Sequence, residues 1–192
     1  MPYKRAKFAP QTRQDLWISS VGICLGIAVG MTFADIDLHM PDWLLPHRAL
    51  FTHGAVVPVC LAWWFWHFRQ QTVRGLTIGF ALAHAVHLSF DLFPKAWRGY
   101  ALIHVFTWAL PPVLSWAWVA ASIVCCLYLV RSFIRTTWDI WLSFGGILTG
   151  FLTYAHEGVV FPLIAFAIAG ILASIIPLFP DSDYAHIRLL SE

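Results

Sequence analysis

Two histidines and an aspartate in the middle of the chain are spaced so that they could bind a metal ion. His84, His87 and Asp91 stand at positions i, i+3 and i+7, which lie on one face of a helix. His87 and Asp91 are one turn apart, so an imidazole and a carboxylate could hold the same cation. The alternative is a His–Asp hydrogen bond that neutralises a carboxylate in an apolar environment.

Two aspartates, Asp35 and Asp37, directly follow the first apolar run of the chain. Two carboxylates this close repel each other unless a cation or a proton lies between them. A bound divalent ion would remove that repulsion, and a solvated loop is the alternative. We therefore include both aspartates among the candidate metal ligands.

The segment 46–54 adds two histidines, His47 and His53, and an arginine, Arg48. A guanidinium group is suited to holding phosphate or carboxylate oxygens because its donors form a fixed fork. Lys95 and Arg98, just past the third apolar run, could extend an anion site or anchor the chain at a membrane edge.

Taken together, these residues provide enough nitrogen and oxygen ligands for one or two divalent ions. Histidine–carboxylate sets without cysteine suit Zn, with Mn or Fe as alternatives. The four cysteines lie in apolar stretches without CxxC spacing and are expected to be packing residues. The metal-ligand candidates are Asp35, Asp37, His53, His87 and Asp91, with His47, Arg48 and His84 as catalytic candidates.

The elements that must position these residues are apolar helices. The 192-residue chain is 59% apolar and only 11% charged, less than half the charged share of a soluble domain, about 25%. Six runs are long enough to cross a bilayer core of about 30 Å. They cover about 16–34, 51–68, 76–93, 113–130, 138–155 and 160–179. The apolar stretch 99–110 is shorter and ends at two prolines, which indicates a half-helix or interfacial helix.

We therefore expect an all-α, polytopic membrane protein with a single domain, 1–192. Its motif-bearing half covers about 16–95, and its supporting helices cover about 99–179. No basic run is long enough to indicate a nucleic-acid partner. With the N-terminus inside, nine Lys and Arg residues fall on the inner side and three on the outer side. This bias predicts an inner-membrane protein with both termini cytoplasmic.

This orientation gathers most histidines and several acids at the outer ends of the helices. His156 and Glu157, in the last outer loop, are secondary candidates, as is Arg98. Ionisable groups at membrane depth are expensive and usually face a partner or a wet cavity.

Glycines at a four-residue spacing mark the first predicted helix as a close-packing one. Gly22, Gly26 and Gly30 would let another helix backbone approach, and Gly146 and Gly150 could do the same in the fifth helix. Packing within one chain is favoured over a dimer interface, and the oligomeric state is left open.

The order and spacing of the polar motifs resemble those of the YdjM-like family, small inner-membrane proteins described as predicted metal-dependent hydrolases. The resemblance covers about residues 30–95. It rests on Asp35-x-Asp37, His47-Arg48 with Thr52-His53, and His87-Leu88-x-x-Asp91.

The leading hypothesis is a metal-dependent hydrolase at the outer membrane interface, acting on a phosphoester such as a phospholipid headgroup. A metal-activated water would attack phosphorus. Arg48 would stabilise the developing charge, and His47 or His84 would protonate the leaving oxygen.

Three other function classes remain open. A metal or proton transporter would need polar residues through the membrane, and the predicted helices carry almost none. A haem carrier would use His84 or His87 with His104 and would leave the aspartates unexplained. A structural membrane subunit would contain the same cluster as a polar network without metal.

Overall fold

The computed structural model describes residues 10, 12–41, 46–93, 102–105 and 108–177. Helices hold 78% of these residues and strands very few, which confirms the all-α expectation. Two 3₁₀ helices, η2 and η3, and two short strands, β1 and β2, accompany the α-helices. In chain order the elements are α1 Arg13–Phe33, η2 Ala34–His39, α2 Val56–Phe68, α3 Gln71–Asp91, β1 His104–Val105, β2 Trp108–Ala109, α4 Pro112–Phe133, α5 Thr137–Thr153, η3 Ala155–Glu157 and α6 Val160–Ile175.

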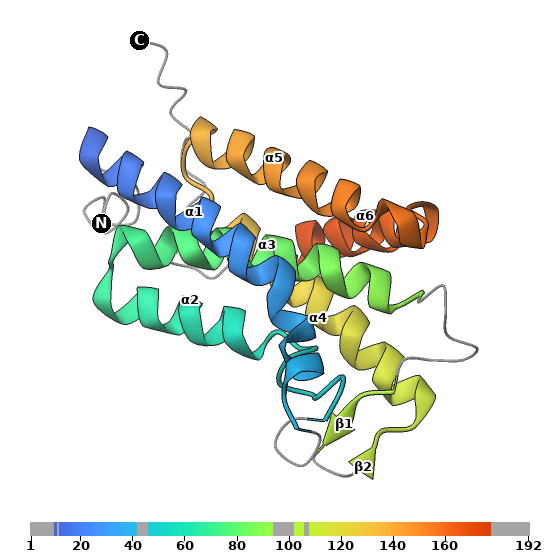
Figure 1. Cartoon of the computed structure of the whole chain (residues 1–192). Coiled ribbons are helices and arrows are strands. Elements are labelled where there is room, and N and C mark those ends of the chain that lie inside the picture. The colour runs from blue at the N-terminus through green and yellow to red at the C-terminus, as the bar shows by residue number, and fades with distance from the viewer. Residues whose placement is uncertain (1–9, 11, 42–45, 94–101, 106–107, 178–192) are drawn as a thin grey trace.

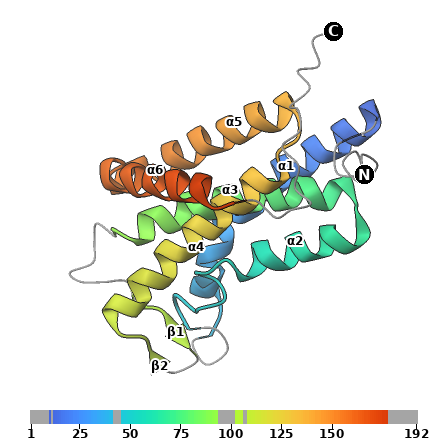
Figure 2. The same ribbon diagram turned by 180° about the vertical axis from the view of Figure 1, so that it is seen from behind.

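Helix α3 is the centre of the bundle (Figures 1 and 2). It contacts each of the other five α-helices. In the most apolar 18-residue window of α3, 94% of the residues are buried inside the protein. The corresponding share is 33% for α1 with η2 and 50% for α4. Polar residues along α3 are therefore surrounded by protein.

Helices α1 and α3 pack backbone against backbone along a glycine seam. A Cβ added at Gly22, Gly26 or Gly30 of α1 would lie 2.5–2.7 Å from a carbonyl oxygen of α3. A Cβ added at Gly75 or Gly79 of α3 would overlap a carbonyl oxygen of α1. The expected packing of these α1 glycines within one chain is confirmed, and the seam brings the ends of both helices close together.

Gly79→Ala should destabilise the protein because the new methyl group would meet the Ile23 carbonyl oxygen, which belongs to helix backbone and cannot rotate away. Overpacking of this kind costs about 1–3 kcal/mol. The matched control is Gly145→Ala in α5, where nothing lies within 4 Å of an added Cβ. Unfolding of both variants in detergent measures the difference. Equal loss in the two variants would contradict the close approach of α1 and α3.

Among the described residues, three segments are long and apolar enough to cross a membrane: Arg13–His39, which combines α1 with η2, then α3 and α4. Helices α2 and α6 are apolar but shorter. Helix α2 begins at Val56 rather than at 51. The residues before it, which include His53, form turns. The six predicted runs therefore correspond to six helices in the described residues, of which three have membrane-spanning length.

The stretch 99–110 was expected to be a helix, and in its described part this expectation is wrong. β1 pairs antiparallel with β2, and His104 also binds the loop before α2. Its N–H donates to the Arg48 carbonyl and its carbonyl accepts from the Leu50 N–H, both at 2.9 Å. Pro111 and Pro112 disfavour a helical conformation at Leu110 and Pro111, the residues that precede them, so α4 begins only at Pro112.

Arg74 was expected in an inner loop but lies inside the bundle, near the start of α3. Its guanidinium donates to both carboxylate oxygens of Asp139 on α5, at 2.8 and 3.1 Å. It also donates to Ser19 Oγ on α1 and to the Phe133 carbonyl of α4. Arg74 therefore belongs to α3 and not to the loop between the predicted runs 51–68 and 76–93. This buried pair joins four helices.

Candidate metal centre

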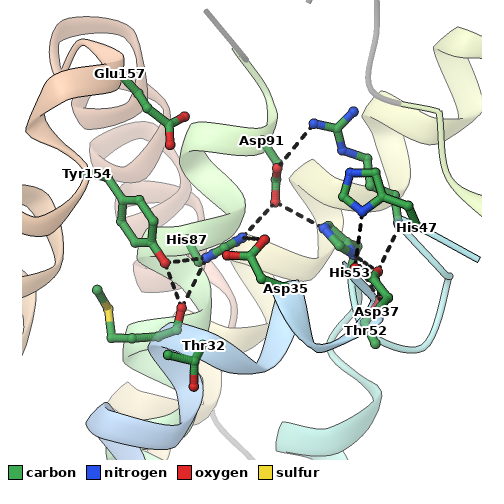
Figure 3. Close-up of polar contacts among 12 residues, drawn as sticks. Thr32, Asp35, Asp37, His47, Thr52, His53, His87, Asp91, Tyr154 and Glu157 are labelled. Atoms are coloured by element: carbon green, nitrogen blue, oxygen red, sulfur yellow. Dashed lines mark hydrogen bonds and ion pairs between the residues drawn. The ribbon is translucent and has the colours of Figure 1, made fainter. Parts of the chain in front are cut away.

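Three separate segments converge at the C-terminal end of α3 (Figure 3). His87 and Asp91 lie in the last turns of α3, and Asp35 and Asp37 lie on η2, which continues α1. His53 lies in the turns before α2. The glycine seam holds α1 along α3, so η2 reaches the end of α3. The structure thus brings together the five residues that the sequence marked as candidate ligands.

Three of these residues present ligand atoms to a common point. One ligand atom from each of His53, His87 and Asp91 lies within 4.8 Å of the other two. Asp91 Oδ2 is 3.5 Å from Nε2 of His53 and 3.4 Å from Nε2 of His87. Two imidazoles and a carboxylate are a ligand set found at catalytic zinc sites and at other transition-metal sites.

The contacts of His53 assign its proton to Nδ1. Thr52 Oγ1 donates to Asp37 Oδ2 at 2.9 Å, which leaves the hydroxyl oxygen to accept from His53 Nδ1 at 3.0 Å. Asp37 Oδ2, 3.4 Å from the same Nδ1, is also an acceptor. Burial lowers the pKa of His53, so the ring stays neutral. Its Nε2 lone pair therefore faces Asp91.

The contacts of His87 place a proton on Nδ1. The Tyr154 hydroxyl donates to the Met31 carbonyl at 2.6 Å and lies 2.7 Å from His87 Nδ1. The Met31 carbonyl is 3.2 Å from the same Nδ1 and can only accept. All three contacts are favourable only when Nδ1 donates. Burial raises the pKa of Tyr154, so the phenol keeps its proton.

This arrangement points the Nε2 lone pair of His53 at Oδ2 of Asp91, and Nε2 of His87 faces the same oxygen. Nε2 of His53 and Oδ2 of Asp91 are buried and have no hydrogen-bond partner within the described part of the chain. Acceptors that face one another without a proton repel, and an unpaired buried polar atom costs about 1–3 kcal/mol. A divalent cation among the three atoms would satisfy each of them. The donor set and its unpaired atoms therefore fit a metal ion.

Asp35 is the fourth candidate ligand. Its Oδ1 lies 3.6 Å from His87 Nε2, and its side chain is 40% exposed. A carboxylate beside the cluster adds negative charge that a cation would neutralise.

Asp37 differs from the direct ligand that its spacing suggested. Its carboxylate is buried and accepts from His47 Nδ1 at 3.1 Å and from the Arg48 N–H at 2.8 Å, in addition to Thr52. It stands behind His53, on the ring side opposite Asp91. A carboxylate in this position orients the histidine that binds the metal.

His47 and Arg48 lie at the edge of the cluster. The side chain of His47 is 42% exposed, and its Nδ1 is hydrogen-bonded to Asp37. Arg48 has a φ of 59°, a left-handed conformation that is unfavourable for a residue with a Cβ. Its backbone N–H bonds Asp37, and its guanidinium lies 3.8 Å from Asp91 Oδ1. The turn therefore places a cationic side chain beside the candidate ligand Asp91.

His84 lies one helical turn deeper in α3 and points elsewhere. Its Nε2 is 3.1 Å from the Gly54 carbonyl, and its ring lies against Phe33 and Phe80. This histidine therefore helps to hold the turns before α2 against α3.

The secondary candidates lie at or beyond the edge of the cluster. His156 and Glu157 form a loose pair at 3.7 Å on η3, and the His156 side chain is 73% exposed. Arg98 and Lys95 lie outside the described residues. Sequence reasoning did not single out Tyr154, although a tyrosine two residues before His156, at an expected outer helix end, was a signal that could have found it.

Comparison of the chain with protein-family models, with curated proteins and with solved structures finds no match.

Proposed function

We propose that this chain is a membrane-bound, metal-dependent hydrolase that cleaves a phosphoester at the outer membrane–water interface. The observation that carries the proposal is the convergence of three candidate ligand atoms, from His53, His87 and Asp91. In the part of the chain that the structure describes, the His53 and Asp91 atoms are buried without a hydrogen-bond partner. Zinc is the favoured ion because two imidazoles and a carboxylate are a donor set of catalytic zinc sites, with Mn or Fe as alternatives. We further propose membership of the YdjM-like family, whose motifs these residues resemble.

The membrane setting is supported by three helices of spanning length and by apolar side chains on the outside of the bundle. Trp17, Val113 and Ile175 are each more than two-thirds exposed. Apolar surface of this extent is costly in water. In the proposed topology all six helices lie in the inner membrane, both termini are cytoplasmic, and the metal centre lies at the outer end.

A cation held by His53, His87, Asp91 and Asp35 would supply Lewis-acid chemistry, including a water nucleophile at neutral pH. The residues of the chain would do the rest. Arg48 would bind a phosphoryl oxygen and stabilise its growing negative charge. His47, held at Nδ1 by Asp37, would have Nε2 available to protonate the leaving oxygen.

A lipid substrate is favoured by the position of the cluster at the end of the bundle. Asp35 and His47 are its most exposed members, so the ester would approach from their side. A centre at the helix ends could reach a phosphorylated headgroup while the acyl chains stay in the bilayer.

Elemental analysis of detergent-purified protein, prepared without chelator or histidine tag, tests the metal centre. We expect at least about one equivalent of Zn, Mn or Fe per chain. Release of phosphate or headgroup from mixed phospholipid micelles then tests hydrolysis. Absence of metal after incubation with each ion would contradict the metal centre, and stoichiometric metal without hydrolysis of any phospholipid would contradict the proposed substrate class.

A further inference from the structure

Tyr154 connects the second half of the chain to the candidate metal centre. It directly follows α5 and lies between His87 on α3 and the last turn of α1 (Figure 3). Its hydroxyl contacts His87 Nδ1 at 2.7 Å and donates to the Met31 carbonyl at 2.6 Å. One phenol therefore links three helices at the candidate ligand.

We infer that Tyr154 is a positioning residue for His87: its hydroxyl keeps the imidazole proton on Nδ1, so that the Nε2 lone pair points at the cation. The inference deepens the proposed function and rests on it, because it assigns His87 as a ligand. A histidine that binds metal through one nitrogen usually donates from its other nitrogen to an oxygen, which fixes tautomer and ring orientation.

The hydroxyl is the part of Tyr154 that carries this role. The Tyr154 ring packs against Phe90, with centroids 5.3 Å apart, and meets His87 edge-on at 5.1 Å. These ring contacts would remain in phenylalanine. Without the hydroxyl, the Met31 carbonyl at 3.2 Å would be the remaining acceptor for Nδ1 in the described structure. A single, longer hydrogen bond holds the tautomer less firmly.

The two candidate histidines are supported in matching ways from different parts of the chain. Nδ1 of His53 is held by Thr52, which in turn bonds Asp37, and both lie inside the motif segment 30–95. Nδ1 of His87 is held by Tyr154, which lies far outside that segment. The ligand set thus depends on α5, which the motifs leave out.

The first test compares cation affinity in wild type, Tyr154→Phe and the control Tyr128→Phe. Tyr128 donates its hydroxyl to the Pro177 carbonyl at 3.4 Å, away from the cluster. Competition of the detergent-solubilised protein with a zinc chelator should show Tyr154→Phe binding about 10–100-fold more weakly than wild type. Tyr128→Phe should bind as wild type does. Equal affinities in all three proteins would overturn the role of Tyr154 and leave the metal centre intact.

The second test reads the His87 ring directly in zinc-loaded protein. Nitrogen-15 imidazole spectra should show Nδ1 protonated and Nε2 bound to zinc in wild type, and a mixture of arrangements in Tyr154→Phe. A wild-type proton on Nε2, or spectra identical in the two proteins, would overturn the inference. Failure of wild type to bind any divalent ion would overturn the proposed metal centre together with this role, so the two failures are distinguishable.

Discussion

Replacement of Asp91 by asparagine is expected to remove divalent-cation binding and, with it, any metal-dependent turnover. Asp91 Oδ2 is the atom that both candidate histidines face, at 3.4 and 3.5 Å. An amide retains the shape of the side chain but lacks the negative charge that offsets the charge of a divalent ion. Loss of a residue that merely orients a ligand costs about 10–100-fold in affinity. Loss of a ligand itself should exceed the upper end of that range.

The same variant has a consequence for stability. A cation that binds only the folded protein stabilises it, so added zinc should stabilise wild type and leave Asp91→Asn unchanged. Thermal unfolding with and without zinc measures both effects.

His87→Ala serves as a second variant, and His67→Ala serves as its control. His67 lies at the far end of α2, exposed, with Nδ1 on the Trp63 carbonyl. His87→Ala should lose zinc stabilisation, and His67→Ala should keep it. Retained zinc affinity in both Asp91→Asn and His87→Ala would refute the assignment of the metal centre.

Replacement of Arg74 by methionine is expected to cause a large loss of stability. The guanidinium is fully buried and bonded to Asp139, Ser19 and Phe133. Its removal would leave the carboxylate of Asp139 buried without its cation. Breaking a buried ion pair on one side costs about 3–5 kcal/mol. Denaturant unfolding in detergent would measure the loss, and Arg13→Met, at an exposed site on α1, should change stability by about 0.5 kcal/mol or less.

A double variant separates the buried charge from the other contacts of Arg74. Asp139→Asn removes the charge and retains an oxygen that can accept from the Thr136 N–H at the start of α5. The double variant Arg74→Met with Asp139→Asn should therefore lose less stability than the sum of the single variants. Strict additivity would mean that the pair contributes no coupling and that packing alone explains the effect.

Local spacing made several features predictable. Apolar runs of about 20 residues indicate helices, because a segment in an apolar environment must satisfy its own backbone hydrogen bonds and a helix does so internally. The i, i+4 spacing put His87 and Asp91 on one face without any other knowledge of the fold. The glycine spacing in α1 indicated close approach of another helix, although it did not name α3 as the partner.

The sequence by itself determined the all-helical class, the apolar runs and the candidate ligands, because these depend on residue type and on periodicity along one element. Only the tertiary structure decided that Asp37 stands behind His53, that Arg74 is buried against Asp139, and that Tyr154 bonds His87. The last two contacts join residues 65 and 67 positions apart. The physical reason is that a hydrogen bond between helices depends on which faces of the helices meet and on how far the helices are shifted along their axes. Tertiary packing decides both the facing surfaces and the shift, and neither is a property of any one segment.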